Sequence, residues 1–245
     1  KYLIHILSNV SDKIYVIQEC KNIKIIKNKR TENLEKYFNK VNKAQKKLFK
    51  KIPKLSKSCK VKIKSINHGE LNFLKLSDIK EFLISDLYIV FGSSYIKGNL
   101  LNFLVKKKTL NIHAGVSPYY RGTDCNFWAL HDNNPHLVGA TIHLLSKGLD
   151  SGPMLYHAMS NVKSNPFEYT MSAVKSAFIS ISKKIRNKSI FKIKPIKQNQ
   201  SKQIRYSRKI DFNEKLAKNF LSKKIDLNNK KIDKSLLKNP YFLIS

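Results

Sequence analysis

The sequence has few acidic residues and few arginines. It contains 16 Asp and Glu against 48 Lys and Arg, and 43 of these basic residues are lysine. A net charge of +32 is typical of proteins that bind nucleic acid or anionic membranes, but phosphate sites favour arginine because its planar guanidinium forms paired hydrogen bonds. Lysine that accumulates with Asn, Ile and Tyr indicates AT-rich codon usage instead. The composition therefore disfavours nucleic-acid binding as the main function.

Cysteine and long apolar runs are also scarce. The three cysteines, Cys20, Cys59 and Cys125, are odd in number and widely spaced, which excludes a disulfide framework and fits a reducing compartment. The longest apolar run, 87–91, is too short to cross a bilayer, and no charged leader opens the sequence. We expect a soluble, cytoplasmic protein with no membrane partner. Histidines at metal-ligand spacing are absent too, so we expect no bound metal.

Hydrophobic periodicity predicts alternating helices and strands. The predicted helices cover 2–10, 34–52, 76–84, 97–106, 125–132 and 166–185. The predicted strands cover 13–19, 61–66, 87–91, 109–113, 138–145 and 154–158, and the continuous apolar run 87–91 is typical of a strand buried on both faces. Alternation at this spacing predicts an α/β fold with a mostly parallel, twisted sheet and helices on both faces.

The two ends of the sequence differ from this regular centre. The sequence opens with Lys1 and a helix that leads into a strand, which is half of a βαβ unit, so we expect that a first strand precedes residue 1. Near the other end, Asn165 and Pro166 mark a helix start, and Glu168 stands where a capping box requires it. We predict one catalytic domain over 1–186 and a lysine-rich C-terminal appendage of low regularity over 187–245. Within that appendage we expect only a short strand at 204–207 and a weak amphipathic helix at 213–221.

Lysine disappears from one internal segment. None occurs between Lys108 and Lys147, although lysine is abundant elsewhere. In its place the segment holds Asn111 and His113, two apart on one predicted strand, so that their side chains project from the same face. A carboxamide can donate to an oxygen that becomes negative, while an imidazole handles a proton near neutral pH. These two residues are therefore candidates for catalysis.

Asp150 follows in a loop between Gly148 and Gly152. If the strands before and after this loop are neighbours of the strand that carries His113, the loop can return Asp150 to that histidine. A carboxylate there could orient the imidazole, stabilise its protonated form, or hold a water molecule that relays protons. A strand-end Asn-x-His pair can also be purely structural, but the Gly and Pro residues around it allow a ligand to approach the backbone.

The motifs of this segment resemble those of the folate-dependent formyltransferase family, which includes glycinamide ribonucleotide transformylase, methionyl-tRNA formyltransferase and the sugar N-formyltransferases. The resemblance extends over 1–185 and is densest from 87 to 158. The motifs that carry it, in order, are Asn111-Ile112-His113, Pro118-Tyr119-Tyr120-Arg121-Gly122, Gly139-Ala140-Thr141-Ile142-His143 and Asp150-Ser151-Gly152.

The resemblance implies a Rossmann-like fold and transfer of a formyl group from 10-formyltetrahydrofolate to a primary amine. Asn111 and His113 would then stabilise the tetrahedral oxyanion, and Asp150 would assist proton movement. The resemblance also places the folate on a mainly backbone surface and the acceptor at the turn after His113. The implied folate-binding residues are Gly92, Ser93, Ser94, Tyr95, Ile96, Gly139, Thr141 and Gly148, and the implied acceptor-binding residues are Pro118, Arg121 and Gly122.

Several alternatives stay open. Arg121 either binds an acceptor phosphate or fixes its own turn, and His143 either lines the site or is satisfied by its neighbours. We favour a nucleotide-linked amino sugar as acceptor, because one catalytic domain with a short tail suits that subgroup. Methionyl-tRNA, glycinamide ribonucleotide, or water in a hydrolase remain alternatives. A non-enzymatic rival is a basic module that binds tRNA or other polyanions, and a homodimer is compatible with each of these.

Overall fold

The computed structural model of the chain describes residues 1–20, 31–227 and 240–243. Its α-helices are α1 (Tyr2–Leu7), α2 (Glu32–Phe49), α3 (Gly98–Lys106), α4 (Cys125–His131), α5 (Pro166–Arg186) and α6 (Glu214–Ser222). Its strands are β1 (Lys13–Cys20), β2 (Lys60–Asn67), β3 (Ile89–Phe91), β4 (Leu110–His113), β5 (Tyr120–Gly122), β6 (Ala140–Leu144), β7 (Met154–Ser160), β8 (Arg205–Ser207) and β9 (Tyr241–Leu243). Short 3-10 helices are η2 (Glu70–Phe73), η3 (Leu76–Leu83), η4 (Pro135–Leu137), η5 (Ser189–Lys192), η6 (Gln200–Lys202) and η7 (Lys209–Asp211).

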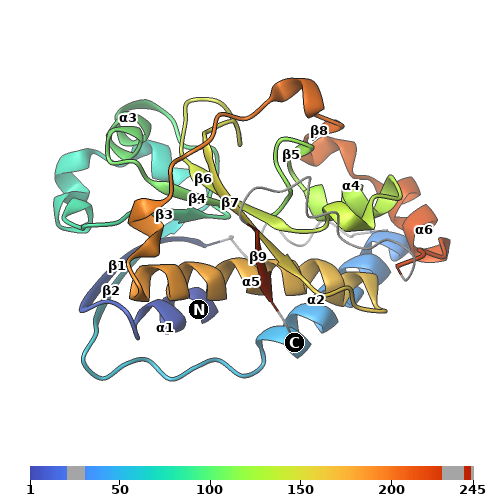
Figure 1. Cartoon of the computed structure of the whole chain (residues 1–245), viewed down its shortest axis with the longest axis horizontal. Coiled ribbons are helices and arrows are strands. Elements are labelled where there is room, and N and C mark those ends of the chain that lie inside the picture. Colours follow the sequence, from blue (N-terminus) through green and yellow to red (C-terminus); the bar gives the residue numbers. More distant parts are fainter. Residues whose placement is uncertain (21–30, 228–239, 244–245) are drawn as a thin grey trace.

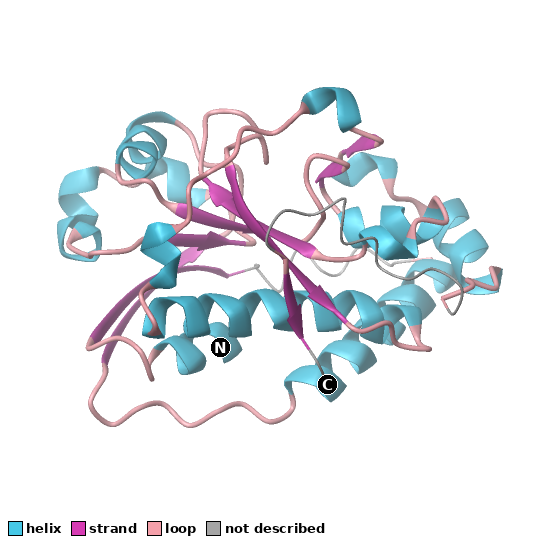
Figure 2. Ribbon diagram, viewed as in Figure 1, coloured by secondary structure: helices cyan, strands magenta, loops and turns pink. Residues whose placement is uncertain are grey.

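The central sheet has the strand order β3-β4-β6-β7-β9, and two smaller sheets pair β1 with β2 and β5 with β8 (Figures 1 and 2). The pairs β1–β2, β3–β4, β5–β8 and β7–β9 are parallel, whereas β4–β6 and β6–β7 are antiparallel. The α/β fold with parallel-rich sheets is therefore confirmed, because four of the six strand pairs among the described residues are parallel. The antiparallel position of β6 directly beside β4 matters for function, because both strands contribute side chains to the candidate site.

Helix α5 covers one face of the central sheet and lies below it in Figure 1. Ala140 and Ile142 of β6 point toward this face and pack against Phe178 and Ile181 of α5, with Ile6 of α1 in the same cluster. The side chains between them on β6 point to the opposite face. This alternation follows from the period of two in a β-strand.

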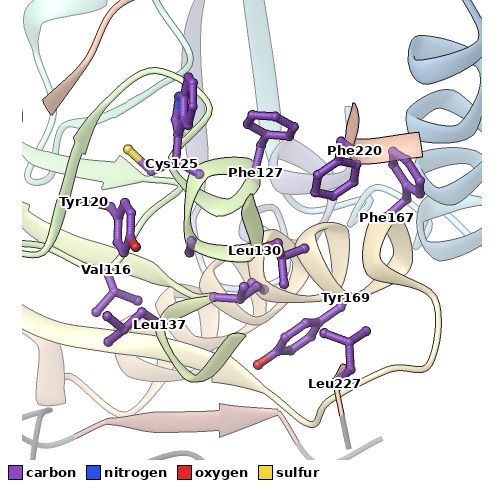
Figure 3. Packing of buried hydrophobic residues seen from close by; sticks show 14 of the residues in the cluster. Val116, Tyr120, Cys125, Phe127, Leu130, Leu137, Phe167, Tyr169, Phe220 and Leu227 are labelled. Carbon is purple, nitrogen blue, oxygen red and sulfur yellow. The ribbon is translucent and has the colours of Figure 1, made fainter. Parts of the chain in front are cut away.

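A second apolar cluster lies around α4 and the first turns of α5 (Figure 3). Trp128 and Leu130 of α4 are buried there with Val116, and Phe220 of α6 packs against the same cluster. A third cluster lies around α3, η2 and η3 and includes apolar residues of β1 and β2. Helices and turns thus cover both faces of the sheet, as expected.

Three local expectations were wrong. Strand β3 is not buried on both faces, because it forms the edge of the central sheet and Phe91 is 41% exposed. The predicted helix 76–84 is a 3-10 helix with a kink at Ile79. The predicted helix 34–52 ends at Phe49, which leaves Ile52 43% exposed instead of on the packed face.

The start of α5 agrees with the predicted cap in part. The Asn165 side chain accepts hydrogen bonds from the backbone N–H groups of Phe167 and Glu168, at 2.9 and 3.2 Å. The Glu168 carboxylate, however, contacts Lys47 of α2, with Nζ–O distances of 2.7 and 2.8 Å. Glu168 therefore joins α5 to α2 instead of completing a capping box.

The segment after residue 186 packs against the rest of the molecule. Strand β8 and helix α6 confirm the predicted short strand and helix. β8 pairs with β5, and Ala217 and Phe220 of α6 are buried in the cluster around α4. The division into 1–186 and 187–245 stays a prediction, but 187–227 supplies part of the core. No helix in the described ranges is long and apolar enough to span a membrane.

Candidate active site

Strand β4 carries Asn111 and His113 on the face of the sheet opposite α5. Leu110 and Ile112, which alternate with them, are buried in the cluster beneath. The antiparallel register places His143 of β6 opposite Asn111. The strand period thus brings a carboxamide and two imidazoles to one face of the sheet, as the sequence predicts for Asn111 and His113.

The loop after β6 returns Asp150 to this face. Its Oδ2 lies 3.3 Å from Nδ1 of His113, and its Oδ1 accepts a hydrogen bond from Nδ2 of Asn111 at 3.3 Å. The backbone N–H of Gly122 donates to Oδ2 at 3.2 Å. The three candidate catalytic side chains therefore meet in one cluster, because β4 and β6 are neighbours and the loop folds back over them.

His143 is a fourth member of the cluster. Its Nε2 lies 3.0 Å from Nδ2 of Asn111 and its Nδ1 lies 2.8 Å from the carbonyl oxygen of Leu144. A carbonyl can only accept, so Nδ1 carries the proton and Nε2 accepts from Asn111. In this arrangement Asn111 donates one amide hydrogen to His143 and the other to Asp150.

Burial and charge set the protonation of the cluster. His113 and Asp150 are only 6% and 9% exposed. Burial lowers the pKa of His113, although the Asp150 carboxylate acts to raise it. Burial acts to raise the pKa of Asp150, but His113, His143 and the Gly122 N–H together outweigh it, and the net pKa is below the ordinary value. At neutral pH the site therefore holds a neutral imidazole beside an ionised carboxylate.

The neutral His113 ring has two acceptors within reach. Nδ1 faces Asp150, and Nε2 lies 3.1 Å from the backbone carbonyl oxygen of Tyr120. A neutral imidazole carries one N–H, and a bond to a carboxylate is stronger than one to a neutral carbonyl. We therefore assign the proton to Nδ1. Asp150 then orients the ring, and Nε2, which lies beside the Tyr120 carbonyl, can donate to that oxygen once it has accepted a proton.

The predicted folate-binding residues separate into two groups. Gly139 and Thr141 are buried and support the turn after His113: the Gly139 N–H donates to Asn126, and the Thr141 hydroxyl donates to the Gly115 carbonyl and accepts from the Ser117 N–H. Direct contact between these two residues and folate stays a prediction. The remaining predicted residues lie in the 92–96 turn and in the loop of Gly148.

The 92–96 turn is held from β1 by a buried carboxylate. Glu19, whose side chain is 7% exposed, accepts hydrogen bonds from the N–H and hydroxyl of Ser94, both at 2.6 Å, and from the Gly69 N–H at 2.8 Å. Tyr95 is exposed, and its hydroxyl donates to the carbonyl of Lys147 at 3.0 Å. The two loops expected to grip folate therefore touch each other.

The predicted acceptor-binding residues have structural contacts. Arg121 donates to the Leu149 carbonyl at 2.7 Å and to the Gln203 side chain at 3.1 Å, so it fixes the neighbouring loops. Gly122 has a φ of +93° and lies so close to the Ser207 carbonyl that a Cβ would stand 1.9 Å from that oxygen. Pro118 lines a cavity of about 170 Å³ together with His157. As acceptor-binding residues all three stay a prediction.

The sequence predictions missed several contributors. The Tyr120 carbonyl and the Gly122 N–H act through the backbone, which no side-chain pattern reveals. Glu19 and Gln198 are distant in sequence from the residues that they hold. Each is a polar side chain that is buried in a lysine-rich stretch, and only this difference from the neighbouring lysines could have indicated them. Among the described residues, no group of three or more His, Cys, Asp or Glu is arranged to hold a metal ion.

Residues 82–185 match the family model described as "Formyl transferase". This segment runs from η3 to the end of α5 and contains Asn111, His113 and Asp150. This part of the chain is therefore similar to formyltransferases. Among curated relatives, methionyl-tRNA formyltransferase of Thermotoga neapolitana is 34% identical over 108 residues, 43% of this chain and 33% of that protein. That of Thermosynechococcus vestitus is 28% identical over 99 residues, 40% of this chain and 30% of that protein.

The chain spans about a third of the length of these curated relatives. A sugar N-formyltransferase structure from Shewanella sp aligns with a TM-score of 0.50 and 14% identity, over 82% of this chain and 78% of that chain, and shows the shared fold. PseJ of Anoxybacillus kamchatkensis, solved with a UDP-linked formamido sugar and tetrahydrofolate, aligns with a TM-score of 0.47 and 18% identity, over 81% of this chain and 87% of that chain.

Proposed function

We propose that this protein transfers a formyl group from 10-formyltetrahydrofolate to a primary amine. The observation that carries the proposal is the convergence of Asn111, His113 and Asp150 within the segment that matches the family. Asp150 contacts both of the other residues at 3.3 Å. The reaction needs a group that removes a proton from the attacking amine and a donor that stabilises the negative oxygen.

The protonation of the site suits this chemistry. The amine nitrogen attacks the formyl carbon, the C–N bond forms, and the carbonyl electron pair moves to oxygen. Nε2 of the neutral His113 accepts the proton that the amine loses. The bond between the formyl carbon and N10 of the folate then breaks, and the proton passes to N10. Asp150 stays ionised and stabilises the imidazolium between these two transfers.

The carboxamide of Asn111 supplies the oxyanion donor. Both of its amide hydrogens are engaged by His143 and Asp150. Asn111 is partly exposed, so a formyl oxygen that approaches from its open side can take over the weaker of these bonds, the 3.3 Å contact with Asp150. Closer contact between Asp150 and the protonated His113 ring then balances that loss.

The acceptor we favour is a nucleotide-linked amino sugar. Residues 187–227 pack back onto the catalytic segment through β8 and α6, and this compact arrangement suits a small acceptor. Methionyl-tRNA is the second candidate, favoured by the sequence similarity to two methionyl-tRNA formyltransferases. Glycinamide ribonucleotide would use the same three residues, as would water in a hydrolase.

The catalytic assignment is tested by His113→Ala and Asp150→Asn. We expect each variant to keep its fold and to lose about 100- to 10,000-fold in turnover, the range for removal of a positioned acid–base group. Turnover is measured as tetrahydrofolate release in the presence of candidate amines. Asp86→Asn, which alters an exposed carboxylate, is the control and should keep wild-type turnover. Near-wild-type rates in both site variants would refute the assignment.

The acceptor is tested separately from the site. Formate and formylated product are measured with 10-formyltetrahydrofolate plus a nucleotide-linked amino sugar, methionyl-tRNA, glycinamide ribonucleotide, or no amine. Product formed only with the sugar supports our proposal, and product with another amine reassigns the acceptor. Formate released at the same rate with and without amines identifies a hydrolase.

A further inference from the structure

Side chains from outside the loop hold the backbone around Asp150. Arg121 donates to the Leu149 carbonyl at 2.7 Å. Nε2 of Gln198 donates to the carbonyls of Asp150 and Gly152, each at 2.8 Å. Both amide hydrogens of this one glutamine therefore bind the residue that carries the carboxylate and the residue two positions later.

The conformation of this loop requires external support. Asp150 has a φ of +46°, a left-handed conformation that costs energy in residues other than glycine. A Cβ at Gly152 would stand 1.7 Å from the Leu144 carbonyl oxygen, so the loop passes very close to β6. A strained backbone persists only where its surroundings fix it. Here those surroundings include Gln198.

Gln198 is well placed for this task. Its side chain is buried, with 6% exposure, although its neighbours Lys197 and Asn199 are exposed. Ile196 anchors the segment by two backbone hydrogen bonds to Met154, both 2.8 Å. The Oε1 atom of Gln198 has no partner among the described residues, so the useful feature of this side chain is its pair of N–H donors.

We propose that Gln198 is a positioning residue for Asp150. It lies outside the segment that matches the family model, so the region after residue 186 completes the catalytic site. The inference rests on the proposed function for its catalytic consequence. Loss of the two N–H donors leaves the Asp150 and Gly152 carbonyls without these partners. The loop then relaxes, and Asp150 moves away from Nδ1 of His113.

Kinetics test this first. Gln198→Leu removes both N–H donors, and Gln198→Glu removes them with little change of shape. The matched controls are Gln200→Leu and Gln200→Glu, at an exposed position of the same segment. We expect kcat to fall about 100-fold in both Gln198 variants, the usual consequence of a misplaced catalytic group, with an unchanged KM for the folate. Wild-type kcat in a folded Gln198 variant, or a change in KM alone, overturns the proposal.

Nitrogen NMR of the His113 ring tests it without reference to activity. In the wild type near pH 7.5 we expect Nδ1 to carry the proton, because it faces Asp150. In Gln198→Leu we expect the proton to move to Nε2, which then donates to the Tyr120 carbonyl. The same tautomer in both proteins overturns the proposal. If the wild type transfers no formyl group, the proposed function fails, yet this measurement still decides the role of Gln198.

Discussion

His157 lies on the same sheet face as His113, across β6. Its Nε2 donates to the Ser117 carbonyl at 2.7 Å, and its Nδ1 has no partner among the described residues. Burial lowers the pKa of His157 from 6.5 to about 4, against the smaller opposing effect of the Ser117 carbonyl. A proton on this ring would introduce a buried charge with nothing to balance it. His157 thus supports the turn after His113 only while it is neutral.

This depressed pKa predicts acid sensitivity. The unfolded chain binds a proton at His157 more readily than the folded chain does. The stabilisation that neutral His157 provides is therefore complete above pH 6.5 and is lost as the pH falls toward about 4. The resulting loss in the free energy of unfolding is about 3 kcal/mol over this range, or about 1.4 kcal/mol per pH unit. In His157→Gln, which keeps an N–H donor, we expect the free energy of unfolding to fall less steeply over this range. Urea unfolding at several pH values measures this pH dependence. Parallel plots of unfolding free energy against pH for the two proteins would contradict the prediction.

At the scale of elements, β8 is tied to α4 by a part-buried ion pair, in which the Arg205 side chain is 37% exposed. Arg205 donates from Nε and NH2 to the two carboxylate oxygens of Asp132, at 2.9 and 2.8 Å, and its guanidinium lies 4.4 Å from the ring centre of Trp128. Asp132 is 15% exposed in its side chain. This pair holds the segment after Gln198 against the segment that matches the family model.

We expect Arg205→Leu to lower the free energy of unfolding by about 1.5–3 kcal/mol, the range for a hydrogen bond that involves a charge. Arg205→Lys should lie between Leu and the wild type, because it keeps the charge but not the paired geometry. The control is Arg208→Leu, which breaks an exposed pair with Asp211 and should change the free energy of unfolding far less. Equal effects of Arg205→Leu and Arg208→Leu in urea unfolding would contradict this role of β8.

The elements that the sequence predicted well are those set by local pattern. The alternation in β1 and β6, the start of α5 and the shared face of Asn111 and His113 all follow from side-chain period and caps. The edge position of β3 did not follow, because strand order depends on pairing between segments far apart. The same reason hid Gln198, whose partners Asp150 and Gly152 lie in another part of the sequence.

At the scale of the whole molecule, positive charge and chemistry are separated along the sequence. The chain carries a net charge of +32, yet the segment from Thr109 to Ser146, which supplies Asn111, His113 and His143, has no lysine. A positive field attracts any polyanion without recognising it. Affinity for tRNA is therefore expected whether or not tRNA is the acceptor, so affinity alone cannot identify the substrate.

Salt dependence separates charge from recognition. Binding through several phosphate contacts weakens by about a thousandfold or more between about 50 and 200 mM salt, so we expect tRNA affinity to fall steeply and to be the same in His113→Ala. Formylation of a nucleotide-linked amino sugar, which carries few phosphates, should change far less with salt and should disappear in that variant. Filter binding and product assays over one salt series measure both. Salt-resistant tRNA affinity accompanied by formylation of methionyl-tRNA would instead show that the positive charge serves substrate recognition.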